Sequence, residues 1–231
     1  MKKVLTGIEK LDEILRGGFP RGSTILVAGG PGTGKTIFAA QFIYFGAIKY
    51  GEKGVFVTFE ESADFFKDNM LTLGWDFESL QKKQLVSILD FISAKGAENI
   101  EIIIEEIIKT VKALEPERLV IDSITALTTS LGSTAEIRIM ISILQKALRR
   151  LGCTTLLTTE IPWGGNTLGT GVEEFLSDGI IVLEMRPRGN LLRRRLIVLK
   201  MRGTELNLRY YYYTISKNIG IEILPYPEAE V

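Results

Sequence analysis

Two residue types that carry much of protein chemistry are scarce in this chain, which has no histidine and one cysteine, Cys153. A disulfide framework, a zinc site of the Cys/His kind and a Ser-His or Cys-His catalytic pair are therefore excluded. Chemistry here must use carboxylates, lysine, arginine, hydroxyl groups or the backbone. Because Cys153 stands at the start of an apolar run, we expect it to be a small core residue.

An excess of one charge is also lacking, because 28 Lys and Arg residues balance 28 Asp and Glu residues. Net charge therefore argues neither for nor against nucleic acid. No stretch approaches the ~18 uninterrupted apolar residues of a membrane span. The N-terminal MKKVLTGIEKLDEIL has no long apolar region, so no signal peptide is expected. We expect a reduced, cytoplasmic protein with a single domain over residues 1–231.

What the sequence does contain is a regular alternation of apolar runs and amphipathic stretches. Strands are predicted at 24–28, 54–59, 85–89, 119–121, 154–158 and 180–183, and helices at 35–50, 62–73, 97–114 and 135–151. This rhythm predicts an α/β fold with a mostly parallel sheet flanked by helices. The last 40 residues differ, and an antiparallel extension of the sheet is predicted at 191–201, 206–215 and 219–224.

A phosphate-binding motif follows the first of these strands. ILVAGGPGTGKTIFAA fits G-x-x-x-x-G-K-T from Gly29 to Thr36, between a predicted strand and a predicted helix. Glycines let backbone N–H groups converge on phosphate oxygens, and the helix N-terminus adds its positive end. A chance match in a Gly-rich turn is the alternative. The predicted ATP contacts are Gly30, Pro31, Gly32, Thr33, Gly34, Lys35, Thr36 and Ile37, with Lys35 on the β/γ-phosphates.

Such a loop needs a second group for its metal ion. The apolar run in RLVIDSITAL ends at Asp122, the position of a Walker B acid. We predict that Mg²⁺ is held by the Thr36 hydroxyl and, through water, by Asp122. The alternative for Asp122 is that it caps a helix.

Two glutamates end the next predicted strand, in VFVTFEES. Strand C-termini of a parallel sheet line the same edge as the phosphate loop. A carboxylate there could orient and deprotonate a water aimed at the γ-phosphate. Adjacent residues point apart, so we predict Glu60 as the principal base and Glu61 as support. Alternatively, both are first-turn acids stabilised by the dipole of the helix from Ser62.

The apolar strand in LIVLKMRG delivers Lys200 and Arg202 to one face, with Met201 on the other. Two like charges side by side repel unless an anionic group lies in front of them. The strand therefore predicts a negatively charged partner at this end.

Together these segments resemble the KaiC-like branch of the RecA-superfamily ATPases over nearly the whole chain. The motifs that carry the resemblance, in the family's order, are TGIEKLDEILRGGFPRGS (6–23), GGPGTGKT, FVTFEES, LGWD (73–76), LVIDSITAL, TTE (158–160), GVEEFLSDGIIVL (171–183) and KMRGT (200–204). The resemblance implies a RecA-like fold and a hexameric ring with ATP and Mg²⁺ between neighbouring subunits. It also implies that Glu60 is the base and that Lys200 and Arg202 reach the neighbour's phosphates.

The same resemblance implies further nucleotide contacts at Thr72, Met201, Thr204 and Ser216. The chain also departs from the family's pattern. Leu206 stands where the family often has histidine, and Lys217 where the clock protein is often acidic. Glu174 and Phe175 match the clock protein's phosphorylated Ser-Thr pair, so clock function is not expected here.

An acid-free stretch from Met185 to Thr204 leaves one alternative open. Its basic residues are Arg186, Arg188, Arg193, Arg194, Arg195, Lys200 and Arg202. They suit nucleic-acid phosphates, as in RecA-like recombinases, but also subunit pairing or a solvated hairpin. Loops 128–134 and 161–171, where RecA-type rings place pore-facing loops, contain no Lys or Arg, which disfavours DNA threading.

The sequence thus predicts an ATP-binding and ATP-hydrolysing homo-oligomer, a hexameric ring with a regulatory or signalling role. Two alternatives remain at this point. One is a RecA-like DNA-binding motor. The other is an ATP-dependent interaction module with negligible turnover.

Overall fold

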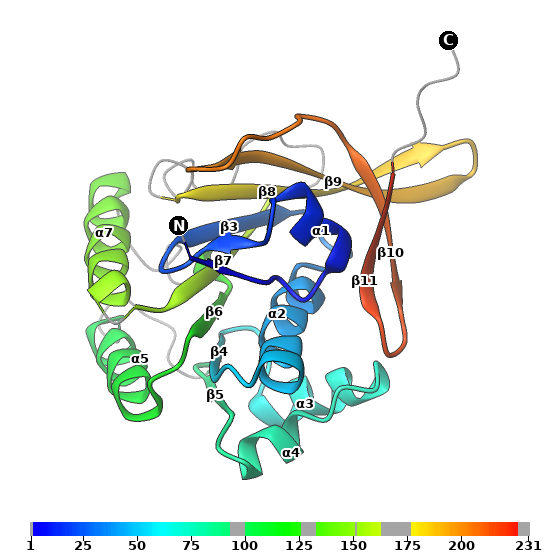
Figure 1. Cartoon of the computed structure of the whole chain (residues 1–231). Helices are drawn as coiled ribbons and strands as arrows, with labels where there is room; N and C mark the ends of the chain where they lie inside the picture. Colours follow the sequence, from blue (N-terminus) through cyan, green and yellow to red (C-terminus); the bar gives the residue numbers. More distant parts are fainter. Residues whose placement is uncertain (1, 93–99, 126–132, 151, 163–176, 226–231) are drawn as a thin grey trace.

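The structure is a computed structural model that describes residues 2–92, 100–125, 133–150, 152–162 and 177–225 (Figure 1). The strands are β1 (Lys3–Val4), β2 (Phe19–Pro20), β3 (Thr24–Gly29), β4 (Gly54–Thr58), β5 (Val86–Asp90), β6 (Arg118–Asp122), β7 (Thr154–Glu160), β8 (Gly179–Arg188), β9 (Leu191–Met201), β10 (Tyr211–Ser216) and β11 (Gly220–Pro225). The helices are α1 (Glu9–Ile14), α2 (Lys35–Tyr50), α3 (Ala63–Thr72), α4 (Phe77–Lys82), α5 (Ile100–Leu114) and α7 (Thr134–Arg150).

In these ranges, one nine-stranded sheet has the order β11-β10-β9-β8-β3-β7-β6-β4-β5. The strands from β8 to β5 in this order pair in parallel. Strands β9, β10 and β11 add antiparallel at the other side. The predicted α/β fold with a C-terminal antiparallel extension is therefore confirmed. Strands β1 and β2 form a separate antiparallel pair.

Helices cover both faces of the sheet. Helices α5 and α7 lie on one face, and α2 with α1, α3 and α4 lies on the other (Figure 1). Each face buries its own apolar cluster, so the parallel strands are covered on both sides. This explains why all six residues of β3 are buried and why the strands form apolar runs without alternation. Of the helices described, none is long and apolar enough to span a membrane.

The predicted elements agree closely with the observed ones in the core of the sheet. Helix α2 occupies the predicted residues Lys35–Tyr50, and β9 the predicted Leu191–Met201. The strand predicted at 206–215 is wrong at its start, because β10 begins at Tyr211 and 206–210 form a turn-containing connection. Helices α1 and α4 and the β1–β2 pair were not predicted, since six-residue helices and two-residue strands show too few apolar positions for a period.

A buried ion pair between Arg118 and Glu52 connects β6 to the N-terminal segment and to α2. The side chain of Arg118, at the start of β6, is fully buried, and its Nε donates to Oε2 of Glu52 at 2.8 Å. Its Nη1 donates to the carbonyls of Leu5 and Phe42 at 2.9 Å and 2.8 Å. A Cβ at position 46 of α2 would overlap the guanidinium, so Gly46 makes room for it. Burial lowers the pKa of Arg118, and Glu52 opposes this shift.

Glu52→Gln is expected to lower the free energy of unfolding by about 3 kcal/mol, because it leaves a buried guanidinium without its counter-charge. Urea unfolding followed by circular dichroism measures the change. Glu106→Gln is the matched control, because Glu106 pairs with Lys109 on the solvated face of α5, and it is expected to cost less than about 0.5 kcal/mol. Equal losses in the two variants would contradict a stabilising role for the buried pair.

Candidate active site

The carboxyl ends of the parallel strands meet at one edge of the sheet. Thr58 at the end of β4 pairs with Asp122 at the end of β6. Gly29 at the end of β3 pairs with Glu160 of β7 at the same level. The expectation that Glu60, two residues beyond Thr58, shares an edge with the glycine-rich loop and Asp122 is therefore confirmed.

The glycine-rich loop joins the end of β3 to the start of α2. Gly32 and Gly34 have φ of +75° and +94°, a region that residues with a side chain rarely adopt. At Gly34 a Cβ would also lie 2.6 Å from Cδ1 of Ile215 in β10. Both glycines are thus required by the loop's shape.

Side chains of the loop bind its own backbone. The hydroxyl of Thr33 and Nζ of Lys35 donate to the carbonyl of Gly30 at 2.8 Å and 3.3 Å. The Tyr213 hydroxyl of β10 donates to the Thr33 carbonyl at 2.5 Å, and Arg194 Nε of β9 donates to the Gly32 carbonyl at 3.1 Å. The antiparallel extension therefore supports the loop, and the N–H groups at the start of α2 remain for an anion.

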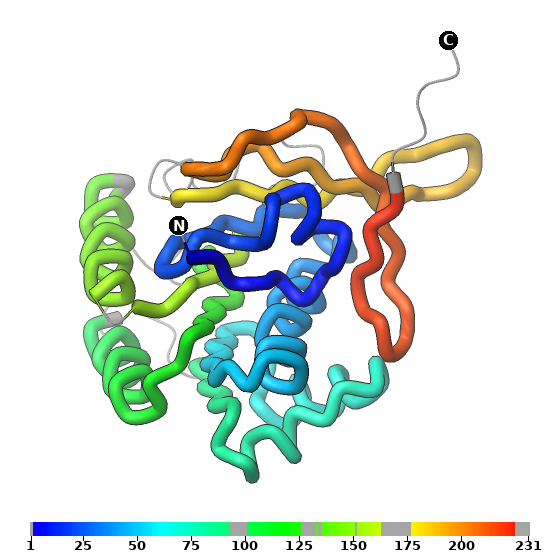
Figure 2. Tube along the Cα trace, viewed as in Figure 1, coloured from blue at the N-terminus to red at the C-terminus, as the bar shows by residue number. Residues whose placement is uncertain are grey.

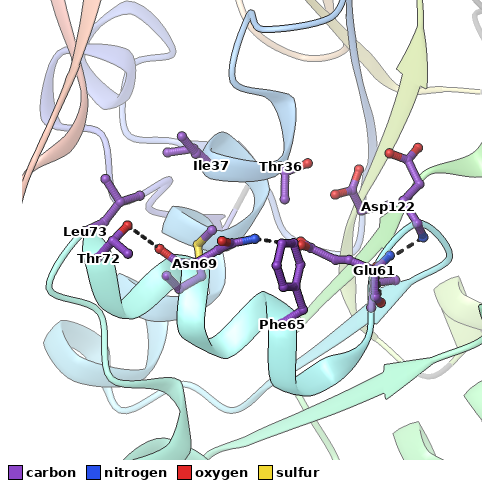
Figure 3. A pocket seen from close by; sticks show the side chains of 11 residues that line it. Thr36, Ile37, Glu61, Phe65, Asn69, Thr72, Leu73 and Asp122 are labelled. Carbon is purple, nitrogen blue, oxygen red and sulfur yellow. Dashed lines mark hydrogen bonds between the residues drawn. The ribbon is translucent and has the colours of Figure 1, made fainter.

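A pocket of about 530 Å³ opens beside the start of α2 (Figure 3). Its walls come from α2, α3 and the ends of β4 and β6. The lining residues predicted from the sequence are Thr36, Ile37, Glu60, Glu61, Thr72 and Asp122. One concave site therefore unites the predicted metal residues, both glutamates and one predicted nucleoside contact.

Asp122 lines this pocket and is buried, with only 5% of its surface exposed. The hydroxyl of Thr158 at the end of β7 donates to its Oδ1. Burial raises the pKa of Asp122, and the hydroxyls of Thr158 and Thr36 act in the opposite direction. A threonine hydroxyl and a carboxylate facing one cavity are hard oxygen donors, and they fit Mg²⁺, which takes one or two protein ligands together with phosphate oxygens.

The two glutamates are held by different partners. Ser123 Oγ donates to Oε1 of Glu60 at 3.1 Å. Asn69 of α3 donates to Oε2 of Glu61 at 2.9 Å (Figure 3). Burial raises the pKa of Glu61, and the hydrogen bond from Asn69 opposes this shift. Helix α3 is instead capped by Ser62, whose hydroxyl accepts from Phe65 N–H, so neither glutamate serves as its cap.

The KMRG segment (200–203) lies at the opposite edge of the sheet, where the parallel strands β3 and β8 begin. Met201 pairs with Gly179 at the start of β8, and Gly179 pairs with Ile25 of β3. The glycine-rich loop begins at Gly29, four residues further along β3 and hence about 13 Å away at ~3.3 Å per residue. Figure 2 shows the chain, in orange, turning back from the end of β9 toward β10.

The two predicted finger residues bind groups of their own edge. Nζ of Lys200 donates to the carbonyl of Ser177 at 2.7 Å. Nη1 of Arg202 donates to Oδ1 of Asp178 at 3.1 Å. Neither side chain lines the pocket beside α2. Within one chain the predicted site is therefore divided between two edges of the sheet.

The remaining predicted contacts follow the same division. Ser216 ends β10 just after Ile215, which packs on the loop glycine, and its buried hydroxyl has no hydrogen-bond partner among the described groups. Thr204 lies on the far edge, where its hydroxyl accepts from Nζ of Lys3 at 3.3 Å. Met201 is only 4% exposed and belongs to the buried apolar cluster, so the structure places this predicted contact in the core.

Three polar residues that position the site were not singled out from the sequence. They are Ser123, Asn69 and Thr158, the partners of Glu60, Glu61 and Asp122. Thr158 belongs to the TTE motif (158–160), which is part of the family resemblance but had no function assigned to it. Ser123 directly follows the Walker B position. Asn69 gave no sequence signal, because it is one polar residue among several on α3.

The basic hairpin of β8 and β9 is partly neutralised within the chain. Glu184 accepts from Arg195 at 2.8 Å and from Arg186 at 3.2 Å. The two loops weighed for nucleic acid lie mostly outside the described residues, as do Glu174 and Phe175. The hairpin therefore gives no independent support to a nucleic-acid surface.

A doubly covered parallel sheet, a glycine loop between β3 and α2, and acids at the ends of β4 and β6 define a P-loop ATPase of the RecA superfamily.

The family model described as "ATPase: KaiC" matches residues 4–228, so the chain belongs to the KaiC ATPase family. A solved KaiC-like protein from Pyrococcus horikoshii OT3 superimposes with a TM-score of 0.88 at 42% identity, covering 97% of this chain and 99% of that one. A UPF0273 protein from Methanocaldococcus jannaschii is 36% identical over 97% of both chains.

The circadian clock oscillator protein KaiC from Thermostichus vulcanus is 39% identical over 97% of this chain. The chain spans 44% of the length of that relative.

Proposed function

We propose that the chain is a Mg²⁺-dependent ATPase that acts as a ring-shaped homo-oligomer, a hexamer, with ATP between neighbouring subunits. The observation that carries the proposal is the division of the predicted site between two edges of the sheet. The pocket edge presents the glycine loop and the acids, and the far edge presents Lys200 and Arg202. A head-to-tail interface brings the far edge of one copy to the pocket edge of the next, and repetition closes a ring.

In this proposal the backbone of Gly30–Thr36 and Lys35 bind the phosphates. Thr36 and Asp122 would hold the metal, which would neutralise negative charge on the phosphates. Glu60, oriented by Ser123, accepts the proton of the attacking water. Lys200 and Arg202 of the neighbouring copy stabilise the negative charge that builds up in the transition state.

The relatives support a regulatory or signalling role, because one is named as a circadian clock oscillator protein. Clock function itself is not part of the proposal, since this chain spans less than half of that relative.

The test is the solution mass of the chain with and without Mg-ATP, combined with specific ATPase activity over a range of protein concentrations. We expect a ring-sized species with nucleotide, and specific activity that rises with concentration until the ring is saturated. A strict monomer that hydrolyses ATP at a concentration-independent specific rate would contradict a shared site. Single-stranded DNA added at low salt is expected not to stimulate hydrolysis.

A further inference from the structure

We propose that Asp178 is a positioning residue that aims Arg202 at the ATP of the neighbouring subunit. The inference rests on the proposed function and adds a residue to it. Asp178 lies just before β8, at the far edge of the sheet, and does not itself line the pocket beside α2.

Hydrogen bonds to the backbone of β3 fix Asp178 in place without the help of an arginine side chain. It is 7% exposed, and its Oδ2 accepts from the backbone N–H of Thr24 at 3.0 Å. Its own N–H donates to the Thr24 carbonyl at 2.7 Å. Its carbonyl in turn accepts from the backbone N–H of Arg202 at 2.9 Å. The carboxylate is thus a fixed point from which a side chain can be oriented.

Among the described residues, this carboxylate binds Arg202 at one guanidinium nitrogen. Its Nη1 donates to Oδ1 of Asp178 at 3.1 Å, while 61% of the side chain is exposed. The rest of the guanidinium therefore faces outward, where its remaining donors fit phosphate oxygens. A long side chain fixed in this way loses less rotamer freedom when it meets the neighbour's phosphate.

A second arginine shares the same carboxylate. Nη2 of Arg149, in the last turn of α7, donates to both Asp178 oxygens at 2.7 Å and 2.6 Å, and its side chain is 48% exposed. Two guanidinium groups on one carboxylate leave the cluster positive. A surface pocket of about 660 Å³ also brings Lys2 and Arg21 to this cluster. The face that carries Arg202 thus keeps a positive field, as an anionic partner requires.

The first test is Asp178→Asn, which keeps the side-chain shape and removes the charge. We expect kcat to fall about 10–100-fold, because misplacement of a catalytic group by about 1 Å has an effect of this size. The KM for ATP is expected to stay within about twofold, since the ATP-binding pocket is untouched. In an Arg202→Ala background the same substitution is expected to lower kcat no further. An undiminished further loss in that background would overturn the proposal.

Subunit mixing supplies a readout that a purely structural role would not change. Asp178→Asn subunits mixed with Lys35→Ala subunits are expected to recover activity. The reason is that the Lys35→Ala subunit supplies a correctly placed Arg202, and the neighbouring Asp178→Asn subunit supplies an intact glycine loop. Asp178→Asn mixed with Arg202→Ala is expected to recover none, since both damage the same edge. If the mixture of Lys35→Ala with Arg202→Ala recovers activity and the mixture of Lys35→Ala with Asp178→Asn does not, the positioning role of Asp178 is refuted while the shared site stands. No recovery in either pair would refute the shared site.

Asp178→Glu keeps the test decisive if Asp178→Asn fails to fold. The glutamate retains the charge but moves the carboxylate by one methylene, so we again expect a lower kcat, an unchanged KM and no effect in the Arg202→Ala background. Wild-type kcat in Asp178→Glu would mean that only the charge matters, against positioning. Glu184→Gln is the matched control, since Glu184, within β8, is also a carboxylate shared by two arginines. Any loss it causes is expected to persist in the Arg202→Ala background.

Discussion

Arg202→Ala is expected to lower ATP turnover by about 10³–10⁵-fold, the range by which an arginine supplied by a neighbouring molecule accelerates phosphoryl transfer. The reason is positional. Arg202 lies at the edge of the sheet opposite the glycine loop and does not line its own chain's pocket. Its charge is therefore expected to act on the transition state at the neighbour's site, and steady-state phosphate release from assembled rings measures the loss.

Nucleotide affinity separates this role from that of the loop. Arg202→Ala is expected to weaken ATP binding less than Lys35→Ala does, because Lys35 lies within the loop itself. Equilibrium binding of a fluorescent ATP analogue measures both. Lys109→Ala removes a cation that is 78% exposed on α5 and serves as the control, with turnover within about twofold of wild type. A turnover loss in Arg202→Ala no greater than in this control would exclude the finger role.

Glu60→Gln is expected to lower turnover by about 10²–10⁴-fold, the usual contribution of a general base. The amide keeps the size of the side chain and its bond from Ser123 but cannot take a proton. Single-turnover hydrolysis of pre-bound ATP measures this step apart from binding. Equal and slow rates in wild type and Glu60→Gln would show that the chain is a non-catalytic nucleotide-dependent module.

Glu61→Gln is the matched comparison, since both glutamates line the same pocket. A smaller loss than in Glu60→Gln is expected, because the Glu61 carboxylate already accepts a hydrogen bond from the Asn69 side chain of helix α3. A larger loss in Glu61→Gln than in Glu60→Gln would mean that Glu61 is the principal base and Glu60 the supporting residue.

Much of the fold could be predicted because its signals are local. The apolar runs of the parallel strands, the loop motif and the helix at Lys35–Tyr50 all depend on neighbours in sequence. Parallel connectivity then places the strand ends at one edge, which is why Glu60 and Asp122 were predicted to meet. The start of β10 was misplaced because Leu206, Leu208 and Tyr210 alternate as a strand does but precede the paired region.

The supporting contacts of the site could not be predicted, because they join residues that are distant in the sequence. Thr158 of β7 reaches Asp122 on the neighbouring strand β6, and Arg149 reaches Asp178 from the end of α7. No spacing rule connects such residues, so only the packing of α7 against the sheet edge identifies the partner. The same applies to Tyr213, whose hydroxyl supports the glycine loop from β10.

The central claim is that one ATP site is built from two copies of the chain, and mixing Lys35→Ala with Arg202→Ala subunits tests it most directly. Each variant alone is expected to be inactive, because every interface lacks either the loop lysine or the finger. In a random equal mixture about one interface in four combines an intact loop with an intact finger across a head-to-tail contact. The account predicts recovery of about a quarter of wild-type turnover, and a mixture no more active than its components would contradict it.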